Sequence, residues 1–124
     1  RSIEGTKLLV DSLSGLSLYK EGKIGIVTVT QEMLSKNNAK MEDTEGIISF
    51  IRDTDCIEVS CLLKEVNSKE IKVSLRSKKD IDVSKIAVKF NGGGHKKAAG
   101  CTIYENIDNS KNIILHEILE SFGD

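Results

Sequence analysis

The residues best suited to chemistry form one short run, Gly92-Gly93-Gly94-His95, followed at once by Lys96 and Lys97. Glycine loses more conformational freedom on folding than any other residue, so a triplet is favoured where the backbone takes unusual dihedral angles or approaches a ligand closely. Consecutive unhindered N–H groups can form an anion-binding concavity, and an imidazole and two amines beside it add donors and positive charge. Taken alone, however, the run is also typical of an ordinary connection between a helix and a strand.

Arg76 is the second candidate, at the end of a strand predicted over residues 70–77. The alternation of this strand assigns Ile71, Val73 and Leu75 to the core and Lys72, Ser74 and Arg76 to the opposite face. A guanidinium group presents a planar fork of donors that matches phosphate oxygens. The alternative is a surface arginine in a solvated row, which the spacing alone does not exclude.

Both candidates lie in a basic segment. Nine basic and three acidic residues fall between Lys69 and Lys97, a balance of +6 in a chain whose formal net charge is −1. An anionic partner would therefore be attracted to this segment rather than to the whole surface.

The elements that must position these residues follow from the hydrophobic pattern. Before the basic segment we predict a loose helix ended by Gly15, followed by strands over 16–20 and 23–29 that are joined at Glu21-Gly22. Two short helices, capped by Thr30 and Thr44, and a strand over 56–66 are predicted next. After Arg76 we predict a helix capped by Asp82, the glycine loop, a strand over 101–105 and a final amphipathic helix. This order predicts an α+β domain over 1–124, with one mixed sheet of about five strands and helices packed on it.

Composition narrows the class of protein. Apolar residues make up 39% and charged residues 30% of 124 residues, enough for one core, and no apolar run approaches the length needed to cross a bilayer. The chain begins with Arg1 and opens without a signal segment, so we expect a piece of a longer cytoplasmic protein, in which residues 1–14 end an interdomain linker helix.

Cysteines and histidines offer no metal or catalytic site. Cys56, Cys61 and Cys101 are odd in number and contain no Cys-x-x-Cys pair, so we interpret them as small buried apolar residues. His116 is predicted on the solvated side of the last helix, far along the chain from His95. A two-metal catalytic centre needs several converging carboxylates and imidazoles, so we expect no catalytic residue, no metal and no unaided hydrolysis by this chain.

The motifs around the glycine run resemble a known family. The motifs are Val73-Ser74-Leu75-Arg76-Ser77, Ile86-Ala87, Phe90-Asn91-Gly92-Gly93-Gly94-His95 and Ala98-Ala99-Gly100. Together they resemble the C-terminal substrate-binding domain of Asp-His-His (DHH) phosphoesterases, above all the bacterial-type oligoribonucleases that also dephosphorylate phosphoadenosine phosphate. Asn91 stands where many members of that family have a fourth glycine.

The resemblance implies a hydrolase of two domains. An upstream DHH domain, absent from this chain, would bind manganese and carry the catalytic residues, while this domain would need no cofactor of its own. Its substrate would be short RNA or a small phosphonucleotide. Arg76 and His95 would contact the substrate phosphate, with Ser77 and the backbone of Gly92, Gly93 and Gly94 beside them.

Two other functions remain open. One is a nucleic-acid-binding accessory domain, as in single-strand exonucleases and proteins related to tRNA synthetases. Such proteins stack bases on exposed aromatic residues, whereas Phe50, Phe90 and Phe122 are predicted in the core and only Tyr19 and Tyr104 remain. The other is a structural domain that mediates contacts in a homodimer, with the glycine loop as a mere connection.

Overall fold

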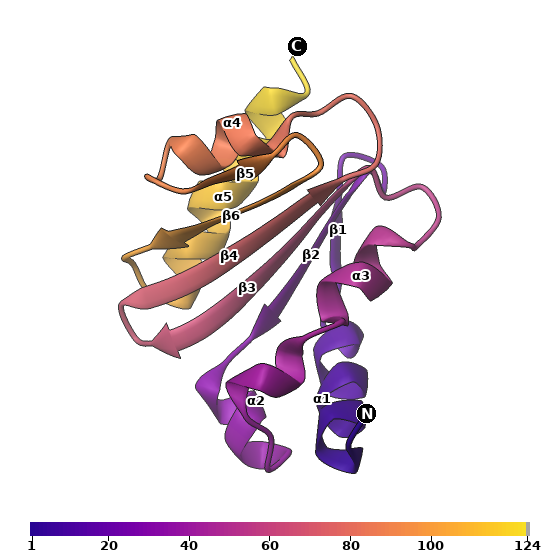
Figure 1. Cartoon of the computed structure of the whole chain (residues 1–124), viewed down its shortest axis with the longest axis vertical. Coiled ribbons are helices and arrows are strands. Elements are labelled where there is room, and N and C mark those ends of the chain that lie inside the picture. Colours follow the sequence, from indigo (N-terminus) through magenta and orange to yellow (C-terminus); the bar gives the residue numbers. More distant parts are fainter. Residues whose placement is uncertain (124) are drawn as a thin grey trace.

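The structure is a computed structural model and describes residues 1–123. Its central feature is one mixed sheet of six strands (Figure 1). The strands are β1 (Ser17–Tyr19), β2 (Ile24–Val29), β3 (Val59–Asn67), β4 (Glu70–Ser77), β5 (Gly93–His95) and β6 (Ala98–Ile103). They lie in the order β1-β2-β3-β4-β6-β5, with β2 and β3 parallel and every other pair antiparallel. The predicted α+β class is confirmed, with one strand more than the five expected.

Helical segments surround the sheet. They are α1 (Ile3–Ser14), α2 (Gln31–Lys36), the 3-10 helix η1 (Met41–Thr44), α3 (Ile47–Arg52), α4 (Val83–Val88) and α5 (Ile107–Ser121). The side chains of Thr30 and Asp82 accept hydrogen bonds from the first turns of α2 and α4, as predicted. The predicted cap at Thr44 is wrong, because Thr44 ends η1 and Gly46, with φ 92°, precedes α3.

Two apolar clusters occupy the two faces of the sheet. On one face, residues of β2, β3, β4 and β6 such as Ile26, Leu63 and Leu75 pack against α4 and α5. On the other face, Val27 and Leu62 pack beneath α1, α2 and α3. The second cluster contains no residue of β4, β5 or β6, so the helices on that face cover only part of the sheet (Figure 1).

The sixth strand arises in the glycine segment. Residues 91–100 were predicted to be a loop before a strand over 101–105, but Gly93–His95 pair with Ala98–Gly100 as an antiparallel hairpin. The backbone N–H of Gly92 donates to the carbonyl of Ala87, 2.9 Å away. The segment is therefore an ordered edge strand of the sheet.

The prediction of the core was wrong at two residues. Cys56 lies exposed in a turn with φ 69°, whereas Cys61 and Cys101 are buried as predicted. Phe50, predicted to be buried, is 56% exposed.

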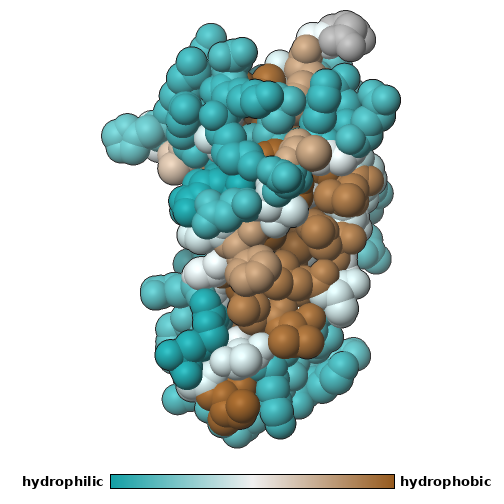
Figure 2. Space-filling view, turned by 90° about the vertical axis from the view of Figure 1, so that its right-hand side faces the viewer, coloured by the Kyte–Doolittle hydropathy of each residue, from teal (hydrophilic) through white to brown (hydrophobic). Residues whose placement is uncertain are grey.

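Figure 2 shows apolar side chains gathered on the side of the molecule where α1, α3 and β1 lie, and the exposed residues of these elements include Val10, Leu18 and Phe50. Within residues 1–123, no helix is both long and apolar enough to cross a membrane.

Candidate functional site

The sheet register brings Arg76 and His95 to one place. Arg76 of β4 pairs with Ala98 of β6, and Ala98 pairs on its other side with His95 of β5. Directly paired residues point to the same face, and two strand spacings separate the backbones of Arg76 and His95 by about 10 Å. The long side chain of Arg76 and the imidazole of His95 therefore lie on the two sides of the small side chain of Ala98.

These residues belong to a larger surface that we call the open face. It consists of the side of the sheet formed by Lys64 of β3, Lys72, Ser74 and Arg76 of β4, Ala98, Gly100 and Thr102 of β6, and Gly93 and His95 of β5. It continues the face covered by α1–α3 but lies beyond their apolar cluster. Its centre is made of small residues and its cationic side chains lie towards the two ends.

The three glycines have different structural roles. A Cβ atom on Gly92 would lie 2.2 Å from the carbonyl oxygen of Gly100, and one on Gly94, whose φ is 145°, would lie 2.5 Å from that of Ala98. Both glycines are therefore required for β5 to pack against β6. A Cβ on Gly93 would meet nothing within 4 Å, and its backbone is not left-handed. Gly93 thus has no packing role and leaves space on the open face.

Ser77 lies apart from the other predicted site residues. It follows Arg76 in β4 and so points to the opposite side of the sheet, where it is 3% exposed and pairs with Val59. Its hydroxyl has no hydrogen-bond partner among the described residues. The structure therefore does not place Ser77 where it could contact a phosphate held by Arg76 and His95.

Three cations lie on the open face without a carboxylate partner. Within residues 1–123, no ion pair joins Lys64, Lys72 or Arg76 to an acidic residue, and Arg76 donates only to the carbonyl of Leu75 at 2.9 Å. Burial lowers the pKa of the half-buried Lys64 amine, and the charges of Lys72 and Arg76 lower it further, against the opposite effect of Glu45. The cations are thus close enough to repel one another.

Lys64 was not found from the sequence. Its strand was predicted from the hydrophobic pattern of residues 56–66, and only the pairing of β3 with β4 shows that Lys64 stands directly opposite Lys72. The signal was present in the spacing, since Lys64 lies an odd number of residues from Cys61 and Leu63 and so faces the other side of the strand.

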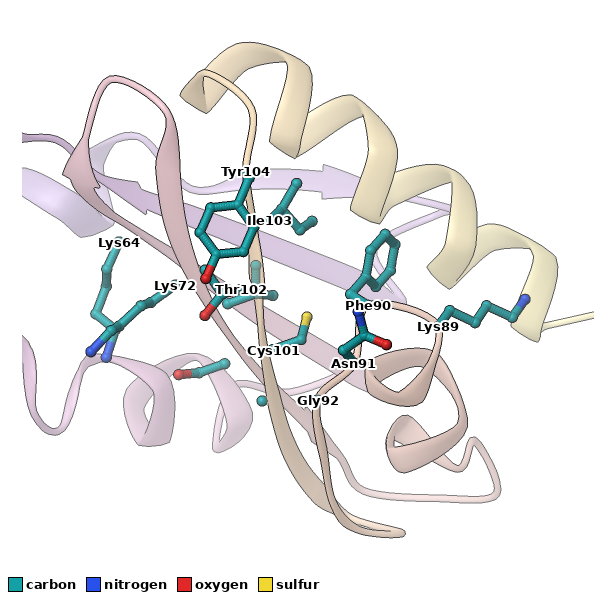
Figure 3. A pocket seen from close by; sticks show the side chains of 13 residues that line it. Lys64, Lys72, Lys89, Phe90, Asn91, Gly92, Cys101, Thr102, Ile103 and Tyr104 are labelled. Carbon is teal, nitrogen blue, oxygen red and sulfur yellow. The ribbon is translucent and has the colours of Figure 1, made fainter.

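A groove of about 810 Å³ extends from the open face around the edge of β6. It is lined by Lys64, Lys72, Ser74, Gly92, Gly100, Thr102 and Tyr104, together with residues of the end of α4. Because β5 pairs only with residues 98–100, the outer backbone edge of residues 101–103 has no β5 partner. Figure 3 shows the amino groups of Lys64 and Lys72 side by side at one end and Tyr104 above the same region.

No group of three or more His, Cys, Asp or Glu side chains within residues 1–123 could hold a metal ion. His116 lies 3.6 Å from Glu120 on exposed α5 and takes no part in the open face. Among the described residues, the candidates on the open face are therefore cationic and hydroxyl side chains together with small residues.

The model of the DHHA1 domain family matches residues 21–123, and the chain belongs to that family.

Particular proteins share this similarity. The chain is 37% identical over 62 residues, half of its length, to the bifunctional oligoribonuclease and PAP phosphatase NrnA of Thermus thermophilus, and the aligned part is 19% of that protein. An exopolyphosphatase-related protein from Bacteroides fragilis superposes with a TM-score of 0.88 at 26% identity, over 97% of this chain and 35% of that one. The pGpG-specific phosphodiesterase PggH from Vibrio cholerae superposes with a TM-score of 0.62 at 12% identity, over 98% and 40%, which shows the fold alone. The chain spans well under half the length of each.

Proposed function

We propose that this domain binds the phosphate of short oligoribonucleotides or small phosphonucleotides, as the substrate-gripping part of a manganese-dependent DHH phosphoesterase. The manganese and the catalytic residues would come from a DHH domain that precedes it in the protein. The observation that carries the proposal is that Arg76 and His95 flank Ala98 on the same face of the sheet.

The chemistry of the two side chains supports this assignment. Arginine donates two parallel hydrogen bonds to phosphate oxygens, and histidine donates one, with a full positive charge when protonated. His95 is exposed and Arg76 is half-buried, so a ligand can reach both. The open space above Gly93 would let the phosphate or its sugar approach the backbone. The similarity to an oligoribonuclease and PAP phosphatase supports the proposed class of substrate.

Alanine substitution in the complete protein tests the proposal. Arg76→Ala and His95→Ala should each weaken binding of a 5′-phosphorylated dinucleotide about ten- to a hundredfold, because each removes a charge-assisted hydrogen bond worth about 1.5–3 kcal/mol. Calorimetry with a metal chelator present measures binding without turnover. Lys7→Ala on exposed α1 removes a charge far from the open face and serves as the control. Wild-type affinity in both site variants would refute the assignment.

A second candidate function rests on exposed aromatic residues. Tyr104 is 70% exposed beside the groove, and a base could stack on it as in proteins that bind long single strands. Such a protein makes many phosphate contacts, and each contributes about −0.7 to the slope of log affinity against log salt. A slope steeper than about −3 for a long single strand would favour an accessory nucleic-acid-binding domain.

A further inference from the structure

Lys64 and Lys72 form a pair that the fold does not explain. They are directly paired residues on neighbouring antiparallel strands, and like charges in that position destabilise a sheet. No acidic residue within 1–123 forms an ion pair with either amine, and Lys64 is only partly exposed to solvent. Glu45 opposes the repulsion at Lys64 but forms no ion pair with it, and an anion bound between the two amines would relieve the repulsion.

Two residues with hydroxyl groups line the same groove as the lysine pair. Thr102 of β6 pairs with Lys72, so the three side chains of Lys64, Lys72 and Thr102 cross three strands in one row. Tyr104 follows two residues after Thr102, and all four residues line the same groove. In Figure 3 the two amino groups lie together at one end of this groove, and Thr102 and Tyr104 lie farther along it. Two ammonium groups and two hydroxyl groups are ordinary ligands of a phosphate.

The pair is separated from the Arg76 and His95 position by a row of small residues. Lys72 and Arg76 are four residues apart on β4 and on the same face, which corresponds to about 13 Å along the strand. Between them lies a row of small residues, Ser74, Gly100 and Gly93, directly paired across β4, β6 and β5. Long side chains can lean inwards over this row, so the two groups of donors can be closer than their backbones.

We infer that Lys64 and Lys72, with Thr102 and Tyr104, form a second phosphate subsite, and that the open face holds a nucleotide ligand with two phosphate groups separated by a nucleoside. The inference rests on the proposed function, since it takes the Arg76 and His95 position as the first subsite. Ser74, Gly100 and Gly93 provide the flat floor on which the sugar or base between the phosphates lies. Ligands of this chemistry are short phosphorylated oligonucleotides and nucleoside 3′,5′-bisphosphates.

Comparing ligands with one and two phosphates separates the two subsites. We expect Lys72→Gln in the complete protein, with a metal chelator present, to weaken binding of a 5′-phosphorylated dinucleotide about three- to tenfold while adenosine 5′-monophosphate binds within twofold of wild type. Adenosine 3′,5′-bisphosphate shows whether one nucleoside spans the two subsites or a strand is needed. Lys72→Arg keeps the charge and should restore most of the affinity, and Lys7→Gln is the matched charge control.

The salt dependence gives a second readout. Removing one phosphate contact should reduce the slope of log affinity against log salt by about 0.7 for the phosphorylated dinucleotide. Lys64→Gln should act in the same direction as Lys72→Gln. If both lysine variants bind every ligand as wild type does, or lose affinity equally for one and two phosphates, the second subsite is wrong. If Arg76→Ala also leaves every ligand unaffected, the proposed function itself fails.

Discussion

One face of the sheet has two parts that differ in almost every physical respect. Under α1, α2 and α3, strand β2 and the first half of β3 are buried on both sides, and Val27 and Leu62 lie in an apolar cluster. Farther along the same face, β4, β6 and β5 carry cations, hydroxyls and glycines in place of that cluster. Side chains on the covered part contribute to stability through burial, whereas the facing amines of Lys64 and Lys72 on the open face repel each other.

The structure also shows that the three glycines of the run have different roles, which the sequence alone does not reveal. Gly92 and Gly94 are needed to pack β5 against β6, which is a structural reason for their presence. Gly93 has no such reason, and it lies on the open face beside Gly100. A single motif therefore combines structural glycines with one whose space is available to a ligand.

The largest expected effect is a difference in the free energy of unfolding between a variant in the covered part of the face and a variant on the open face. Leu62→Ala in β3 removes a buried side chain from the part of the face covered by α1–α3 and should lower the free energy of unfolding by about 2–5 kcal/mol, through lost burial and a cavity. Ser74→Ala on the open face should change it by no more than about 0.5 kcal/mol. Urea denaturation measures both free energies, and equal losses would contradict the difference between the covered part and the open face.

Two neighbouring glycines allow a packed position and an open position of the glycine run to be compared directly. Gly92→Ala should destabilise the protein by about 1–3 kcal/mol or more, because its Cβ would collide with the backbone of β6. Gly93→Ala should leave the unfolding free energy within about 1 kcal/mol, since its Cβ enters open space, yet weaken phosphate ligands roughly tenfold by occupying that space. Thermal denaturation and calorimetry on both variants test this contrast, and an unchanged affinity of Gly93→Ala would mean that ligands do not approach there.

The smallest expected effect concerns the stability of the ligand-free protein. Lys64→Met should raise the free energy of unfolding by up to about 1 kcal/mol at pH 7, because it removes a half-buried charge that faces Lys72. The pKa of Lys64 is lowered in the folded chain, so the advantage should disappear as the pH rises through that pKa towards 10.5. Denaturation at pH 7 and pH 10.5 checks the sign, and a destabilised variant at pH 7 would contradict it.

Local patterns in the sequence were sufficient for most of the fold. Alternation placed Arg76 opposite the core, and the cap at Asp82 marked the start of α4. The strand Gly93–His95 could not be predicted, because three residues containing two glycines have no strand propensity and are held only by pairing with β6. Phe50 was misassigned because a short apolar stripe does not show which side of a six-residue helix faces the sheet.

What the chain determined locally was the identity and the facing of its chemical groups: a basic segment, a glycine run and an arginine on the polar side of a strand. Only tertiary structure decided which of them meet. Ala98 brings Arg76 and His95 together, and β3 brings Lys64 to Lys72. The opposite facing of Ser77, in contrast, already follows from its place next to Arg76 in the strand. The physical reason is that strand register is set by long-range pairing and burial, which no local spacing contains.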